Sequence, residues 1–294
     1  MTGLASVDGR IVPAAEARVS VFDRGFLYGD SVFEALRTYG GVPFALTEHL
    51  ERLARSAERA LIPLPVPIER FRAEVDEVVR AAQNSETYLR LMLTRGTGTA
   101  LGLDPALGSA PVRLILALPL VEPKPEPYER GIGVITYRTQ RVADQTPASG
   151  AKLSNYMVSV LAMSEARGAG ADEALVVDAE GRVVEGTTSN VYVVRAGALV
   201  TPPEEDGILV GITRQKVLEI ARALAVPVEQ RSLAPSDFAS ADEAFISSSI
   251  REIVPVVRVD GAPVGAGVPG PVTVRLLRKF RELAREGRFS AEGS

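Results

Sequence analysis

The chain contains no cysteine and a single histidine, His49. The lack of cysteine excludes a disulfide framework, a thiolate metal site and a cysteine nucleophile. One histidine excludes a zinc site built from several histidines and leaves little for a Ser-His-Asp triad. No run of about 18 apolar residues occurs, and residues 1–13 lack the apolar core of a secretory signal. We therefore expect a cytoplasmic protein.

The overall composition is ordinary for a soluble globular protein, with 46% hydrophobic and 24% charged residues among 294. The 33 basic and 37 acidic residues give a net charge of −4, so nothing indicates a nucleic-acid or anionic-membrane partner. The length favours two domains. Residues 119–128 contain four prolines and predict a semi-rigid linker between a small domain, 1–118, and a larger domain, 129–294.

Two charged residues, Lys152 and Glu185, stand out in the second half of the chain. Lys152 precedes a helical apolar pattern over residues 153–162, and Tyr156, four residues later, would share its helical face. A lysine with a lowered pKa can form a Schiff base with an aldehyde, most often pyridoxal phosphate, whose pyridine nitrogen needs an acidic partner such as Glu185. Taken singly, either residue would more often be a solvated surface charge.

A possible phosphate site lies in residues 211–225. The sequence predicts a helix from Arg214 to Ala225 with Thr213 as its N-cap, and Lys216 stands where a capping box would have Glu or Gln. The first-turn amides are then open to a phosphate dianion. An ordinary cap hydrated by water is the alternative.

Aromatic residues and arginines gather in the N-terminal third. Tyr28, Phe33 and Arg37 could line a pocket, or be two core aromatics and an arginine at a sheet edge. Tyr88 and Arg90 lie on one face of a strand predicted over residues 88–94, because side chains alternate along a strand. That pair could hold a substrate carboxylate.

Local patterns complete the secondary-structure prediction of this region. Residues 47–61 predict a helix that begins at Thr47 and carries one apolar stripe, on which Arg52 would be solvated by periodicity alone. Residues 17–22 alternate like a strand, and Asp8-Gly9 predicts a type I′ turn.

Residues 96–102 contain a GxGxxxG pattern after a strand, which hints at a dinucleotide-binding loop. Pro105 and Gly108 stand where the crossover helix should start. We therefore reject that interpretation.

Five stretches of sequence together resemble the class IV, or fold-type IV, aminotransferases that use pyridoxal phosphate. They are YGDSVFEALR (28–37), HLERLARSA (49–57), AKLSNYMVSVLAMSEARGAGADEALVVDAEGRVVEGTTSNVYVV (151–194), GITR (211–214) and ISSSIREIVP (246–255). The family includes branched-chain aminotransferases, D-amino acid aminotransferases, R-selective amine transaminases and aminodeoxychorismate lyases.

This resemblance implies pyridoxal 5'-phosphate as the cofactor and Lys152 as the catalytic residue that holds it as a Schiff base. Glu185 matches the carboxylate at the pyridine nitrogen, and Tyr156 matches a hydroxyl beside the ring. The residues that match the phosphate site are Arg52, Ile212, Thr213 and Ser249, with the register open among Ser247, Ser248 and Ser249. The expected substrate site comprises Tyr28, Phe33, Arg37, Tyr88, Arg90, Ser248 and Ile250.

The implied fold is α/β (α+β), with a small N-terminal α/β domain, a larger C-terminal domain with a β-barrel-like core, and the cofactor in the cleft between them. The implied reaction is ping-pong transfer of an amino group from an apolar, branched-chain type amino acid to 2-oxoglutarate through Lys152, in a homodimer.

Several departures keep other activities open. The spacing from Lys152 to Tyr156 is one residue shorter than is usual in branched-chain enzymes, and Asp30 departs from that subfamily's pattern. D-amino acid transfer, or mixed specificity that includes (R)-amines, is therefore the alternative, and aminodeoxychorismate lyase is the third. Ala100 and Gly102 replace the Arg-x-His element of D-amino acid enzymes, which counts against their mode of binding the carboxylate.

Overall fold

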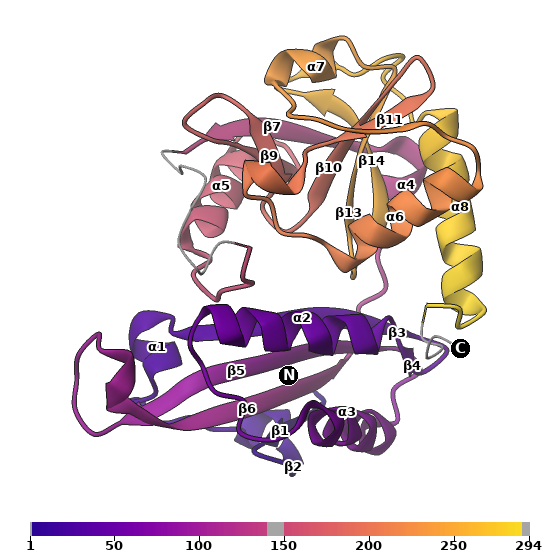
Figure 1. Ribbon diagram of the computed structural model, residues 1–294. Coiled ribbons are helices and arrows are strands. Elements are labelled where there is room, and N and C mark those ends of the chain that lie inside the picture. The colour runs from indigo at the N-terminus through magenta and orange to yellow at the C-terminus, as the bar shows by residue number, and fades with distance from the viewer. Residues whose placement is uncertain (1, 140–149, 290–294) are drawn as a thin grey trace. The chain divides into compact units, whose positions relative to one another are not determined.

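The computed structural model describes residues 2–139 and 150–289 (Figure 1). Within these ranges the chain divides into two compact units. The first contains residues 2–122, 150–155 and 284–289, and the second contains residues 123–139 and 156–283. The short segment that carries Lys152 thus groups with the N-terminal part of the chain, which the sequence did not predict.

The first unit is built on a six-stranded antiparallel sheet in the order β2-β1-β6-β5-β3-β4. Its strands are β1 (Leu4–Val7), β2 (Arg10–Pro13), β3 (Ser31–Tyr39), β4 (Val42–Pro43), β5 (Thr87–Gly98) and β6 (Gly108–Pro119). The helices are α1 (Arg24–Tyr28), α2 (Leu46–Arg59) and α3 (Ile68–Ala82), with 3-10 turns at Ala14–Glu16 and Pro105–Leu107. Asp8 and Gly9, with φ of 52° and 86°, form the left-handed turn that the sequence predicts.

One face of this sheet packs under α2 and α3. Leu89, Leu91 and Leu93 of β5 are fully buried in the core that these helices share with the sheet. Tyr88 and Arg90, between them in sequence, are half-buried on the opposite face. The prediction that Tyr88 and Arg90 share a face is confirmed.

The second unit contains a nine-stranded mixed sheet in the order β12-β11-β10-β13-β14-β7-β8-β9, with β15 beside β14, which curls into a half-barrel. Its strands are β7 (Ile132–Arg138), β8 (Glu173–Val177), β9 (Val183–Gly186), β10 (Asn190–Arg195), β11 (Ala198–Thr201), β12 (Val228–Gln230), β13 (Glu243–Ser248), β14 (Glu252–Val259) and β15 (Ala262–Pro263). Its helices are α4 (Glu126–Arg130), α5 (Met157–Gly168), α6 (Ile212–Ala223), α7 (Pro235–Ala239) and most of α8 (Pro271–Arg285), with a 3-10 turn at Glu204–Asp206. A core of aliphatic side chains, among them Val177, Val193 and Ile246, fills the sheet interior. The predicted mixed α/β fold class is confirmed.

Two local predictions for the first unit are wrong. Residues 17–22 form no strand, because Val21 and Phe22 are 64% and 62% exposed and their alternation meets no core face. The helix α2 begins after Ala45, which takes a left-handed φ of 48° without a side-chain cap, so Thr47 is not its N-cap. None of the helices within residues 2–139 and 150–289 has the length and hydropathy that a membrane crossing requires.

Candidate active site

Lys152 lies beside the edge of β3 in a short extended segment. Its neighbour Leu153 forms an isolated antiparallel bridge with Val32. The Phe33 N–H donates to the Lys152 carbonyl at 3.1 Å, and the Lys152 N–H donates to Ser56 Oγ on α2 at 3.1 Å. The backbone of Lys152 is therefore fixed by β3 on one side and by α2 on the other.

The helix that the sequence places beside Lys152 begins later. Met157 is the first residue of α5, and Tyr156 is its N-cap residue, with φ −94° and ψ 11°. Because Lys152 lies outside the helix, the predicted i+4 relation between Lys152 and Tyr156 is wrong. Leu153, which completed the apolar pattern, packs instead against the core of the first unit.

The ring of Phe33 is shared by two cationic side chains. Lys152 Nζ lies 4.8 Å from the ring centroid, and Arg90 Cζ lies 4.0 Å from it. Arg90 reaches Phe33 because it pairs with Ala35, two residues along β3 on the same face. The face of an aromatic ring attracts cations through its quadrupole. The fold thus gathers three of the expected site residues: Lys152, Phe33 and Arg90.

Arg37 and Tyr88 pair with each other further along the same face. Four residues along a strand separate Arg37 from Phe33 by about 13 Å. The Arg37 Nη2 donates to Glu122 at 3.2 Å, and its Cζ lies 4.6 Å from the Tyr39 ring centroid. Arg37 is thus engaged by groups near the far end of β3.

Arg52 of α2 takes part in a buried cluster with Glu34 and His49. Arg52 Nε and Nη2 donate to the two Glu34 carboxylate oxygens at 2.7 and 2.6 Å, and His49 Nδ1 lies 2.7 Å from Glu34 Oε2. Burial by itself raises the pKa of Glu34, but the charge and hydrogen bonds of Arg52, with help from His49, lower it to about 2. Burial also lowers the pKa of His49. Arg52 is therefore oriented by an ionised carboxylate.

This cluster predicts a loss of stability in acid. The folded-state pKa of Glu34 lies below its ordinary value of 4.5. The stabilising contribution of Glu34 to the folded state is therefore complete above pH 4.5 and disappears as the pH falls toward about 2. The loss amounts to roughly 3 kcal/mol in the free energy of unfolding. Urea titrations at about pH 5 and about pH 3 should show a smaller decrease for Glu34→Gln than for the wild type. Equal decreases would contradict this, and Glu77→Gln, on the half-exposed side of α3, should behave as the wild type does.

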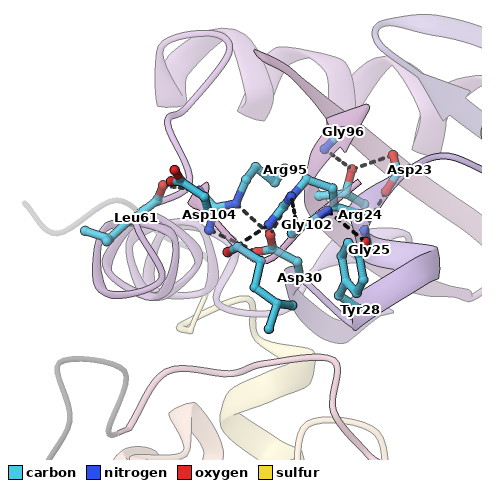
Figure 2. Close-up of polar contacts among 12 residues, drawn as sticks. Asp23, Arg24, Gly25, Tyr28, Asp30, Leu61, Arg95, Gly96, Gly102 and Asp104 are labelled. Atoms are coloured by element: carbon cyan, nitrogen blue, oxygen red, sulfur yellow. Dashed lines mark hydrogen bonds and ion pairs between the residues drawn. The ribbon is translucent and has the colours of Figure 1, made fainter. Parts of the chain in front are cut away.

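Tyr28, at the end of α1, belongs to a separate group of contacts in the first unit (Figure 2). Its Oη accepts a hydrogen bond from the Gly102 N–H at 3.2 Å, and Arg24 Cζ lies 5.3 Å from its ring centroid. The Tyr28 side chain is 37% exposed. The Tyr28 ring is therefore held by Gly102 and Arg24 while part of it stays accessible to solvent.

Glu185 lies near the end of β9 in the second unit. Its Oε2 accepts a hydrogen bond from the Leu209 N–H at 3.2 Å, and Asn190 Nδ2 donates to the Leu209 carbonyl at 2.8 Å. Leu209 is three residues before the start of α6. Glu185 is thus linked to the segment that leads into this helix.

The N-terminus of α6 has Gly211 as its N-cap, with no side-chain cap, so the prediction of Thr213 in that role is wrong. Ile212 and Thr213 instead form the first turn, where N–H groups have no acceptor within the helix. Thr213 Oγ1 lies 3.3 Å from Ser249 Oγ. Hydroxyls from two elements therefore meet at a helix N-terminus.

The three consecutive serines differ in their contacts. Ser247 Oγ lies 2.9 Å from Tyr192 Oη, and Ser248 Oγ accepts a hydrogen bond from the Arg251 N–H at 3.3 Å. The third serine, Ser249, is the one whose hydroxyl meets the first turn of α6. Ile250 follows it in the same turn.

Three residues with clear positioning contacts were not singled out from the sequence: Glu34, Ser56 and Asn190. Glu34 had a detectable signal, since it is a charged residue inside a strand that is otherwise apolar over residues 32–36. Ser56, which is 1% exposed, follows Arg52 by one helical turn and shares its face. Asn190 carries no comparable signal.

Comparison with known proteins identifies the family of the chain. Residues 31–259 match the family Amino-transferase class IV. A putative branched-chain-amino-acid aminotransferase of Methanocaldococcus jannaschii is 40% identical over 94% of this chain and 95% of its own. A D-alanine aminotransferase of Bacillus licheniformis is 34% identical over 90% of this chain and 92% of its own.

Solved structures give the same result. The branched-chain aminotransferase of Escherichia coli superimposes with a TM-score of 0.92 at 32% identity, covering 97% of this chain and 96% of that one. The enzyme of Thermobaculum terrenum, solved in its PLP-form, has a TM-score of 0.86 at 29% identity, over 98% and 96% of the two chains. The chain therefore belongs to the class IV aminotransferases, whose cofactor is pyridoxal 5'-phosphate, and it is a transaminase.

Proposed function

We propose that this transaminase moves the amino group of an apolar, branched-chain type amino acid to 2-oxoglutarate in a ping-pong reaction. The observation that carries the proposal is the group of Lys152, Phe33 and Arg90, in which an amine and a guanidinium lie within 4.8 Å of one aromatic ring centroid. The ring suits an aliphatic side chain, and the guanidinium suits a carboxylate.

The residues of the chain fit pyridoxal phosphate. When bound, this group supplies an aldehyde that reacts with amines and a protonated pyridine ring that withdraws electrons. Lys152 supplies the amine for the aldehyde carbon. The Thr213 and Ser249 hydroxyls, 3.3 Å apart at the start of α6, form a donor set for a phosphate dianion, together with the Ile212 and Thr213 N–H groups. Glu185 supplies the carboxylate that a protonated ring nitrogen requires.

Further residues complete the proposed cofactor and substrate contacts. Arg52 donates to the phosphate, and its orientation by Glu34 prepares it for that role. Tyr156 provides a hydroxyl beside the ring. Ser248 and Ile250 contribute to the binding of the substrate carboxylate, with Tyr28, Tyr88 and Arg37 in the wall of the substrate pocket.

Lys152 performs the proton transfer. As a free amine, Lys152 would take the proton from the substrate Cα and return it at the cofactor C4′. The bound cofactor would carry the amino group from the donor to 2-oxoglutarate, and Lys152 would move the proton in the opposite direction for the acceptor.

D-amino acid transfer is the second candidate. The observation in its favour is the D-alanine aminotransferase relative, which matches 90% of this chain. Against it, Ala100 and Gly102 offer no charged side chain to a carboxylate.

Donor screening tests the proposal. With 2-oxoglutarate as acceptor, we expect kcat/KM for L-leucine to exceed that for D-alanine by about 100-fold, the discrimination that a well-matched pocket provides. A preference for D-alanine would support the second candidate. Release of pyruvate from aminodeoxychorismate, with no transfer from L-leucine, would support the lyase activity.

We also propose that the enzyme is a homodimer. The first turns of α5 expose Met157 and Val160 at 68% and 59%, and Phe26 and Leu103 of the first unit are 70% and 78% exposed. Exposed apolar groups of this kind often mark association surfaces. Light scattering on the purified protein should give twice the chain mass of 31.3 kDa. A cytoplasmic location stays a prediction.

A further inference from the structure

A buried charge cluster adjoins the contacts of Tyr28. The Asp30 cluster consists of Arg24, Asp30 and Arg95 (Figure 2). Asp30 Oδ2 accepts from Arg24 Nε at 2.9 Å and from Arg95 Nε at 2.6 Å, and Asp30 Oδ1 accepts from Arg95 Nη2 at 2.9 Å. The arginines are 4% and 5% exposed. Burial raises the pKa of Asp30, but hydrogen bonds from Arg95 and Arg24 outweigh it and hold the pKa below its ordinary value.

Two guanidinium groups share one carboxylate, so the cluster carries one excess positive charge. Backbone carbonyls accept the remaining hydrogen bonds of the two arginines. Arg95 donates to the carbonyls of residues 60–61, which directly follow α2, where the helix dipole is negative. Arg24 Nη1 and Nη2 donate to the carbonyls of Gly102 and Leu103 at 2.7 and 3.3 Å. Each guanidinium nitrogen of Arg24 and Arg95 therefore has a protein acceptor, and the cluster needs no anionic ligand. Because its arginines tie backbone segments together, we call the Asp30 cluster the clamp.

The two arginines of the clamp act on different elements. Arg95 holds the end of α2, and Arg24 holds the segment 99–104 that follows β5. Both backbone polar groups of Gly102 are hydrogen-bonded. Its carbonyl accepts from Arg24, and its N–H donates to Tyr28 Oη. Gly102 has φ +153°, a conformation that side chains rarely adopt. Because Tyr28 Oη accepts from Gly102, its own proton can be donated elsewhere.

We propose that Arg24, held by Asp30, is a positioning residue for Tyr28: it fixes Gly102, and Gly102 in turn orients the Tyr28 hydroxyl to donate to the substrate. This inference rests on the proposed function, which places Tyr28 in the substrate pocket. It explains why an aspartate occupies position 30. A neutral side chain there would leave two buried guanidinium groups without a counter-charge.

Arg24→Met in the holoenzyme tests the proposal. We expect KM for the amino donor to rise about tenfold with kcat changed by no more than about twofold, the pattern of a lost binding interaction. Arg24→Lys keeps the charge beside Asp30 but lacks the planar fork of donors that reaches the Gly102 and Leu103 carbonyls, so KM should stay raised. Hydrogen exchange of the peptide that contains residues 99–104 should be faster in both variants.

Arg113→Met is the matched control. Arg113 pairs with the buried Glu74 at 2.7 and 2.9 Å within the same unit, without contact to Tyr28 in the described residues. The Arg113→Met variant should lower Tm about as much as Arg24→Met does, but it should leave KM for the amino donor unchanged. A purely structural role for Arg24 would give the two variants the same kinetic behaviour.

A double-mutant cycle with Tyr28→Phe completes the test. If Arg24 acts through the Tyr28 hydroxyl, Arg24→Met should change KM little in the Tyr28→Phe background. Independent, additive effects would overturn the proposal, as would an unchanged KM in Arg24→Met. Lack of transaminase activity toward every donor in the wild type would instead contradict the proposed function, while hydrogen exchange would still report on the clamp.

Discussion

Replacing Lys152 by alanine is expected to abolish transamination, with a decrease in kcat of at least about 10⁴-fold. Lys152 is proposed both to hold the cofactor and to carry the proton from the substrate Cα, so its removal eliminates both functions. The purified variant should also lack the visible absorbance of the lysine-bound cofactor. Steady-state assays and an absorbance spectrum measure the two effects.

The chain offers a simple control for this variant. It contains only four lysines: Lys124, Lys152, Lys216 and Lys279. Lys279 on α8 pairs with Glu282 at the surface. Lys279→Ala should keep both activity and absorbance. Turnover by Lys152→Ala at more than about 1% of the wild-type rate would refute the assignment.

Replacing Glu185 by glutamine is expected to lower kcat by about 100-fold or more. A carboxylate stabilises a protonated pyridine nitrogen by a charge-assisted hydrogen bond, and a neutral amide does not. Because glutamine can keep the contact with the Leu209 N–H, the fold should be preserved. Rates of the half-reaction with L-leucine, measured by stopped-flow absorbance, give the effect on chemistry alone.

Glu180→Gln provides the comparison for this prediction. Glu180 lies in the turn just before β9 and pairs with Arg182 at the surface, 3.2 Å away. The Glu180→Gln variant should react at the wild-type rate. If Glu185→Gln also reacted at the wild-type rate, Glu185 would have no role in keeping the ring nitrogen protonated.

Elements set by local interactions could be predicted from the sequence. The apolar stripe predicted over residues 47–61 lies on α2, where Leu50, Leu53 and Ala57 are buried, and Asp8-Gly9 turns as expected. Tyr88 and Arg90 share a face because period two is an intrinsic property of a strand. These features need no knowledge of distant parts of the chain.

The setting of Lys152 depends on distant residues. Leu153 completes an apolar helical pattern in sequence, yet it bridges Val32, more than a hundred residues earlier, and joins the core of the first unit. Pairing with a free strand edge outweighs the weak helical preference of a short segment. The assignment of Lys152 from the resemblance stays a prediction, and no local pattern could predict the hydrogen bond to Ser56.

Buried polar clusters were the hardest features to predict. Periodicity places Arg52 in solvent, whereas the Glu34 carboxylate, which His49 also contacts, compensates its charge inside the fold. Asp30 looked like a departure from a subfamily pattern, and the structure shows it between Arg24 and Arg95, which are 71 residues apart in sequence. Such compensation requires partners from separate strands and helices, so it follows only from the tertiary structure.

Mass mapping of the cofactor attachment tests the central claim most directly. The holoenzyme is treated with borohydride, which makes the lysine–cofactor bond permanent, and is then digested and analysed by mass spectrometry. We expect a phosphopyridoxyl group on the peptide that contains Lys152 and unmodified peptides for Lys124, Lys216 and Lys279. Modification of any of these three, with Lys152 unmodified, would contradict the account.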